Sequence, residues 1–244
     1  MPFDMPLAEE IWGAKYRFRS ADAEDADLGA TLDRVAEAVA RAEKPAVRKQ
    51  WRTRFRVALS DFRFIPAGRI LAGAGTGRNV TLFNCFVMGT IPDNLPGIFE
   101  HLREAAVTLQ QGGGVGMDFS TIRPAGAAVR GVGAEASGPL SFMDTWDAMC
   151  RTIMSAGQRR GAMMGCLRID HPDIEAFIRA KDQGDLRNFN ISVGITDTFM
   201  QAVQDDGDFE LVHKAAPGPT LKAAGARQRA DGLWVYRTLR ARAL

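Results

Sequence analysis

The first part of the chain carries apolar residues at helical spacing. Residues 1–20 contain a short amphipathic piece, IWGAKYRF, and the acidic residues 21–26 predict a loop. In residues 28–43 and 46–62 apolar side chains recur every three or four positions, which predicts two amphipathic helices. Their apolar faces consist of Leu32, Val35, Ala36 and Val39 in the first and Trp51, Phe55, Ala58, Leu59 and Phe62 in the second. We therefore expect an N-terminal helical region over residues 1–63.

The pattern changes after residue 63, where short apolar runs begin to alternate with amphipathic stretches. Residues 64–79 are rich in glycine and are not expected to form a regular helix. The apolar run 81–88 predicts a buried strand. Further strands are expected within 112–120, 161–169 and 188–195, with helices at 95–111, 139–154, 171–180 and in TDTFMQAVQ. This alternation predicts an α/β domain with parallel strands over residues 64–244.

Three local features complete this pattern. Asp170 precedes the helix expected at 171–180 and is predicted to cap it. Residues 214–229 predict an exposed loop. At the C-terminal end Leu233, Val235 and Leu239 enter a further element as the sequence stops. A frayed final helix and the truncation of a longer chain both fit this ending, and we favour truncation.

The composition is that of a globular protein and excludes several classes. Hydrophobic residues make up 46% and charged residues 25%, and a formal net charge of +2 gives no broad basic field for nucleic acid. No stretch approaches the roughly 18 apolar residues of a membrane span, and the N-terminus is not a signal peptide, so we expect a cytoplasmic protein. Cys85, Cys150 and Cys166 form no CxxC pair and the histidines are scattered, which argues against a structural zinc site.

Three glycine-rich segments are candidates for ligand contact. QQGGGVG, 110–116, is neither a P-loop nor a dinucleotide fingerprint; its glycines fit close approach of a ligand or, preferably, tight helix–strand packing. IRPAGAAVRG, 122–131, and SAGQRRGAMM, 155–164, place arginines beside flexible backbone, which suits an anion site but also suits solvated loops. By residue type alone, Cys85 is most simply a small core residue.

Several long segments, taken in order, closely resemble the vitamin-B12-dependent (class II) ribonucleotide reductases. They cover nearly the whole chain and are IWGAKYRF, PAGRILAGAGTGRNVTLFNCFVMGTIPD, QQGGGVGMDFSTIRPAGAAVRGVG, ASGPLSFMDTWDAMCRTIMSAGQRRGAMM, DHPDIEAFI and NFNISVGITD. The resemblance implies an N-terminal helical segment followed by the first half of a ten-stranded α/β barrel. It also implies reduction of ribonucleotides to 2′-deoxyribonucleotides for DNA synthesis. In the family, adenosylcobalamin generates a thiyl radical and a thioredoxin-type reductant restores a cysteine pair.

Carried over residue by residue, the resemblance makes Cys85 the first cysteine of that redox pair. The residues implied to border the ribonucleotide substrate are Asn84, Cys85, Gly113 and Gly114. Those implied to bind a dNTP or ATP effector are Asp93, Arg123, Val129 and Arg130. Those implied to relay effector identity to the substrate are Gly157, Gln158, Arg159, Arg160 and Gly161. The family's effector site lies at a dimer interface, so a homodimer is a further expectation.

The chain departs from the family pattern in its cysteines. The family's finger loop carries an Asn-x-Cys-x-Glu signature, which does not occur here, and no cysteine follows Cys166. The radical cysteine, the partner of Cys85 and most of the cobalamin site are therefore expected in a C-terminal remainder of the reductase. The alternatives are a non-catalytic nucleotide-binding module and the remnant of a truncated gene.

The isolated chain should reduce no ribonucleotide, because hydrogen abstraction needs the missing radical cysteine. The measurement is deoxynucleotide formation with adenosylcobalamin and a dithiol. Product formed by this chain alone would contradict the assignment.

Overall fold

The computed structural model describes residues 3, 5–129, 131, 133–153, 162–182 and 184–244. These residues form two compact units, each considered by itself below. The first unit contains the residues up to Cys85 together with Gln111–Gly113, and the second contains Phe86–Gln110 and most of the chain from Gly114 onward. Within these ranges, no helix combines the length and the apolar character needed to cross a bilayer.

The first unit is helical, as the sequence predicts. Its α-helices are α1 (Pro6–Lys15), α2 (Leu28–Ala40), α3 (Arg48–Leu59) and α4 (Gly68–Gly73), with 3₁₀ turns η1 (Pro45–Val47) and η2 (Ser60–Phe62). The prediction that 64–79 holds no regular helix is wrong for α4. Its two glycines are the first and last helical positions, so their low helix propensity acts only at the ends.

A buried polar network organises the first unit. Asp25 is buried, and its carboxylate accepts hydrogen bonds from Arg34 Nη2 (2.8 Å), Thr31 Oγ1 (2.7 Å) and the Phe18 amide (3.1 Å). Thr31 Oγ1 in turn accepts from Trp12 Nε1 at 3.0 Å. Burial alone raises the pKa of Asp25, but the bonds from Arg34, Thr31 and Phe18 outweigh it and lower the pKa below its usual value. A charged carboxylate therefore joins α1, α2 and the segment between them.

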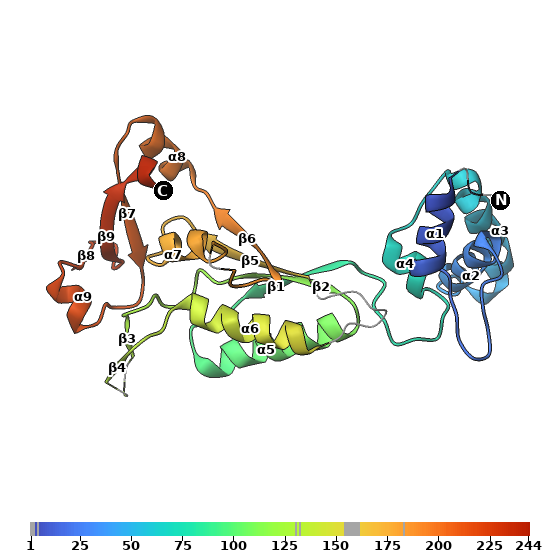
Figure 1. Cartoon of the computed structure of the whole chain (residues 1–244), viewed down its shortest axis with the longest axis horizontal. Helices are drawn as coiled ribbons and strands as arrows, with labels where there is room; N and C mark the ends of the chain where they lie inside the picture. The colour runs from blue at the N-terminus through green and yellow to red at the C-terminus, as the bar shows by residue number, and fades with distance from the viewer. Residues whose placement is uncertain (1–2, 4, 130, 132, 154–161, 183) are drawn as a thin grey trace. The chain divides into compact units, whose positions relative to one another are not determined.

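The second unit is built on a four-stranded sheet with the order β1-β2-β5-β6. Its strands are β1 (Cys85–Thr90), β2 (Gly114–Asp118), β5 (Met163–Arg168) and β6 (Phe189–Gly194). The β2–β5 and β5–β6 pairs are parallel. The connections contain α5 (Leu95–Gln110), α6 (Pro139–Thr152) and α7 (Ile174–Arg179), visible in Figure 1. The predicted α/β class with parallel strands is confirmed.

Two smaller antiparallel sheets accompany the parallel one. β3 (Ala128–Val129) pairs with β4 (Ala134–Glu135), and β7 (Asp208–His213), β9 (Trp234–Arg240) and β8 (Arg227–Gln228) form a second sheet in that order. The remaining elements are α8 (Asp197–Gln204), α9 (Pro219–Ala223) and η3 (Ala241–Ala243). The prediction of an exposed loop at 214–229 is wrong. This segment contains α9 and β8, and Pro217 and Gly218 are buried. Val235 and Leu239 belong to the strand β9 and not to a frayed helix, and the 3₁₀ turn η3 follows this strand.

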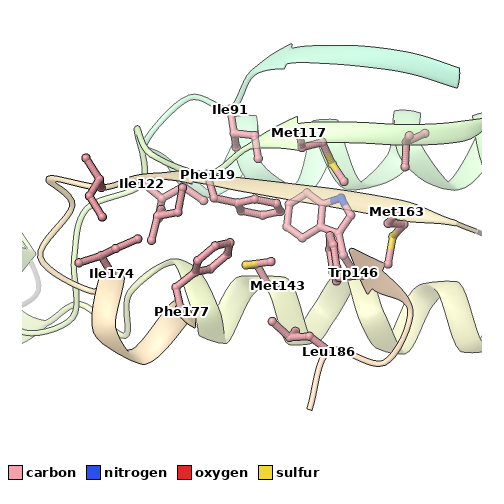
Figure 2. Packing of buried hydrophobic residues seen from close by; sticks show 14 of the residues in the cluster. Ile91, Met117, Phe119, Ile122, Met143, Trp146, Met163, Ile174, Phe177 and Leu186 are labelled. Atoms are coloured by element: carbon pink, nitrogen blue, oxygen red, sulfur yellow. The ribbon is translucent and has the colours of Figure 1, made fainter. Parts of the chain in front are cut away.

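The core of the second unit lies between the parallel sheet and its helices. Along β2 and β5 every second side chain is buried, as expected for one covered face. Phe119 packs edge-on against Trp146 of α6, with ring centroids 5.5 Å apart (Figure 2). It also packs edge-on against Phe189 of β6, with ring centroids 6.0 Å apart. Gly165 allows this close packing, since a Cβ there would lie 2.6 Å from the Met143 methyl carbon.

Two further expectations from the sequence are corrected. The run 81–88 is not a buried strand, because β1 begins only at Cys85 and its side chains are exposed or half-buried, with Val87 95% exposed. Asp170 does not cap α7, which begins at Ile174. Asp170 pairs instead with the Arg168 guanidinium, since α7 starts too far along the chain for its carboxylate to reach the first helical amides.

Trp146→Ala should destabilise the second unit by about 3–5 kcal/mol, because it removes a fully buried indole and leaves a cavity. Trp146→Phe should cost far less, about 1–2 kcal/mol. The reason is that the buried indole N–H has no hydrogen-bond partner within the described part of the chain. Urea titration followed by circular dichroism measures both changes.

Val107→Ala on α5 is the matched control, since this side chain is 43% exposed and should change the unfolding free energy by less than ~0.5 kcal/mol. Equal losses for Trp146→Ala and Val107→Ala would contradict the position given to the indole.

Candidate functional site

A cleft of about 1230 Å³ opens in the second unit. Its walls come from the segment after β1, the segment 121–129, the turn after β5 and the segment after β7. We call residues 121–129 the Arg123 loop. The three predicted effector residues that the structure describes, Asp93, Arg123 and Val129, all line this cleft. The cleft therefore brings together residues that are distant in sequence.

Asp93 and Arg123 form a tightly connected ion pair on the cleft wall. Arg123 Nε lies 2.9 Å from Asp93 Oδ2 and 3.1 Å from Oδ1, and the Arg123 amide donates to Oδ1 at 3.0 Å. The guanidinium also donates to the Asp93 carbonyl at 3.2 Å and to the Ala128 carbonyl at 3.4 Å. The two side chains are 28% and 29% exposed, so the pair faces the cleft while its geometry is fixed by protein groups.

The Arg123 loop is held by bonds along its length. Thr121 Oγ1 donates to the Ile91 carbonyl, and the Ala125 amide donates to Asp173 Oδ2 at 2.9 Å. At its far end the Ala128 amide donates to the Ala216 carbonyl at 2.9 Å. The loop is thus a built part of the cleft rather than a solvated surface loop, which was one of its two possible interpretations.

Two histidines, His171 and His213, line the cleft. His171 is buried; its Nε2 lies 3.0 Å from the Ile122 carbonyl, and its Nδ1 accepts from the Asp173 amide at 3.1 Å. Burial lowers its pKa to about 4, so the ring is neutral at neutral pH and Nε2 carries the proton. The ring of His213 packs edge-on against the ring of His171, with 5.4 Å between the ring centroids. Burial lowers the pKa of His213 as well. No motif joins positions 171 and 213, so the sequence pattern does not predict this pair of histidines.

The charged side chains that line the cleft balance one another. The described basic residues are Arg123, Arg168 and Lys214, and the described acidic ones are Asp93, Glu135 and Asp170. Three positive charges against three negative ones give no net attraction for a polyanion. The described lining therefore offers hydrogen-bonding groups without a net charge.

The residues expected to border the substrate divide between the two units. Asn84 and Cys85 are exposed and Gly113 is buried in the first unit, whereas Gly114 begins β2 in the second. The neighbouring Gly112 has φ +89°, and a Cβ there would lie 2.5 Å from Arg69 Nη1. At this position the glycine run makes a tight packing contact.

The other two cysteines differ from Cys85 in burial. Cys150 on α6 is buried, as expected for a packing residue, and Cys166 on β5 is half-buried. Burial raises the pKa of both thiols, with Asp147 adding to the effect at Cys150 and Asp118 at Cys166.

The remaining predicted effector residues lie outside the described residues. They are Arg130, Gly157, Gln158, Arg159, Arg160 and Gly161.

Two family models match this chain in succession. Residues 4–79 match the ribonucleotide reductase all-alpha domain, and residues 83–237 match the ribonucleotide reductase barrel domain. The boundary between the two matches falls close to the point where helices give way to alternating strands and helices. The barrel-domain match covers more than half of the 244 residues.

Individual relatives agree with this assignment. A vitamin B12-dependent ribonucleoside-diphosphate reductase of Mycobacterium tuberculosis is 40% identical over 190 residues, which is 76% of this chain and 27% of that protein. The protein of the same name from Thermoplasma acidophilum is 39% identical over 183 residues, 74% of this chain and 23% of that protein. A ribonucleoside-diphosphate reductase large subunit of monkeypox virus is 32% identical over 160 residues, covering 63% and 21%.

The chain thus spans about a quarter of the length of the curated relatives it matches. An all-alpha match precedes a barrel match in the same order as the helical and α/β units, and the most similar of these relatives are B12-dependent. This chain belongs to the ribonucleotide reductase large-chain family.

Proposed function

We propose that this chain is the N-terminal part of a B12-dependent ribonucleoside-diphosphate reductase and that its cleft binds the effector nucleotide. The observation that carries the proposal is the Asp93–Arg123 pair, which joins two predicted effector residues on the wall of one cleft. The cleft lies beyond the carboxyl ends of β2 and β5, where α/β sheets usually bind ligands.

Asp93 is the group best placed to recognise the effector's sugar. Arg123 and the backbone amide fix its carboxylate, leaving further lone pairs for a ribose or deoxyribose hydroxyl. Because the Arg123 guanidinium is already paired with Asp93, its main role is to orient that carboxylate rather than to bind phosphate. Lys214, exposed on the segment after β7, makes no ion pair among the described residues and is available to a phosphate group.

Cys85 supplies the first thiol of the reducing pair. Its exposure at the start of β1 suits a residue that must exchange with a second thiol, since disulfide exchange requires an accessible sulfur. The electron donation itself would consume two thiols, oxidising both to a disulfide while the substrate is reduced, so it also needs a second cysteine from the remainder of the reductase.

The relatives from Mycobacterium tuberculosis and Thermoplasma acidophilum are named as vitamin B12-dependent, and we assign no cobalt ligand among the described residues of this chain. Both ring nitrogens of His171 are engaged, and the ring of His213 accepts a bond from the Ala215 amide. When bound, the cofactor supplies the radical chemistry. The described residues of this chain contribute the nucleotide-binding cleft and the Cys85 thiol.

Between the alternatives, the packing favours a folded part of a reductase over an unfolded remnant. The core of the second unit joins buried residues from every strand of the parallel sheet except β1 and from α5 to α7. A non-catalytic nucleotide-binding module uses the same cleft and differs only in having no catalytic remainder.

Arg123→Ala should weaken binding of dTTP and dATP about tenfold, because Asp93 loses the groups that orient it and keeps an unpaired charge. Arg123→Lys should restore only part of the affinity, since an ammonium cannot reproduce the forked contact. Isothermal titration calorimetry of the whole chain measures the dissociation constants.

The control is Arg103→Ala, which removes an exposed arginine of α5 that pairs with Glu100 and does not line the cleft. It should bind as the parent does. If the parent binds neither nucleotide, or if Arg123→Ala binds as tightly as Arg103→Ala, the effector proposal fails.

The thiols of Cys85 and Cys150 should differ in reactivity, with Cys85 alkylated at least about tenfold faster than Cys150 near neutral pH. Cys85 is exposed, whereas Cys150 is buried with a raised pKa and so presents less thiolate. Pulsed iodoacetamide labelling and peptide mass spectrometry give the separate rates. Cys85→Ser should abolish the fast phase without changing the circular dichroism spectrum. Equal rates for the two thiols would remove the support for an accessible redox thiol.

A further inference from the structure

Besides Asp93, which accepts a hydrogen bond from the Arg123 amide, two side chains from outside the Arg123 loop bond to its backbone, one on each side of Arg123. His171 holds the carbonyl of Ile122, the residue before Arg123, at 3.0 Å. Asp173 holds the amide of Ala125, two residues after it, with 2.9 Å between the nitrogen and Oδ2. Both side chains come from the turn between β5 and α7. One short segment therefore bonds to the backbone on both sides of Arg123, the residue that orients Asp93.

The two gripping side chains are themselves joined. The Asp173 amide donates to His171 Nδ1 at 3.1 Å, which leaves the proton of the neutral ring on Nε2, facing the Ile122 carbonyl. Gly138 provides the space for the hydrogen bond between Asp173 and the Ala125 amide. A Cβ on Gly138 would lie 2.7 Å from Asp173 Oδ2 and 2.9 Å from the Ala125 nitrogen. The surroundings are thus shaped around the bond between Asp173 and Ala125.

The far end of the loop is held differently. The Ala128 amide donates to the Ala216 carbonyl, and the Gly218 amide donates to the Gly126 carbonyl at 2.8 Å. These are backbone contacts that most substitutions leave intact. Substitutions at positions 171 and 173 therefore act directly on the backbone that flanks Arg123.

We propose that His171 and Asp173 are positioning residues for nucleotide recognition, which set the Arg123 loop so that Arg123 presents the Asp93 carboxylate to the ligand. The inference rests on the proposed function, because the ligand it serves is the effector nucleotide of that site. Neither hydrogen bond requires His171 or Asp173 to contact the ligand. Their effect passes through the backbone of Ile122 and Ala125 to the Asp93–Arg123 pair.

The test compares Asp173→Ala with Asp173→Asn in the whole chain, using dTTP and dATP as probes. Asp173→Ala should weaken both affinities about tenfold, because the Ala125 amide loses its acceptor. Asp173→Asn keeps an acceptor oxygen at the same place and should stay within about threefold of the parent. His171→Gln, which retains a donor near the Nε2 position, should likewise bind better than His171→Ala.

Hydrogen exchange of the Ala125 amide gives a readout that does not depend on nucleotide. Exchange should be faster in Asp173→Ala and close to the parent rate in Asp173→Asn, while amides of the β5–β6 pair stay protected in both. A general loss of packing would instead raise exchange in β5 and β6 too, and that result would overturn the positioning role.

The outcomes separate the two claims. If the parent binds neither dTTP nor dATP, the effector site is wrong and this inference falls with it. If the parent binds and Asp173→Ala binds equally well, the effector site stands and the positioning role is wrong. If Asp173→Asn is as weak as Asp173→Ala, the carboxylate acts through its charge rather than as an acceptor for Ala125, which also overturns the inference.

Discussion

The second unit depends on burying one face of its parallel sheet against the helices that connect the strands. Parallel strands need crossover connections, and these run back along the covered face, where Trp146 and Phe119 fill the space between layers. The segments that leave β1, β2 and β5 at their carboxyl ends then meet beside one another. The contacts Asp93–Arg123 and Thr121–Ile91 are the direct result, and so is the cleft that they border.

Much of this architecture follows from the sequence pattern. The helices 28–40 and 48–59 and the parallel strands β2, β5 and β6 were predictable, because their periodicity is strong and each is bounded by clear turn signals. The antiparallel β7–β9–β8 sheet was not predictable. Its middle strand in space is the last in sequence, and the segment between β7 and β9 has the glycine, proline and lysine content of a loop. Pairing with distant residues, such as Ala216 with Ala128, decides its structure.

The candidate site shows the same division. The residue types alone left the Arg123 loop open between an anion site and a solvated loop, and it was the family resemblance that singled out Asp93 and Arg123. Neither source indicated that the two side chains bind each other, since they lie 30 residues apart and no local rule pairs them. The sequence pattern does not single out His171 or Asp173, because His171 belongs to no motif and Asp173 lies in an ordinary helix start. Their role depends on contacts 48 and 49 residues away in the chain.

The sealed position of Trp146 also gives the molecule an internal optical probe. An indole enclosed by apolar side chains emits at shorter wavelength than one in water, and Trp146 is fully enclosed. Cys150 lies one turn further along α6, and thiols quench indole fluorescence at short range. Trp12 is buried in the cluster of the first unit, so the two indoles belong to separate cores. In a variant with Trp51 and Trp234 replaced by phenylalanine, the emission of each remaining indole would therefore follow the opening of its own unit.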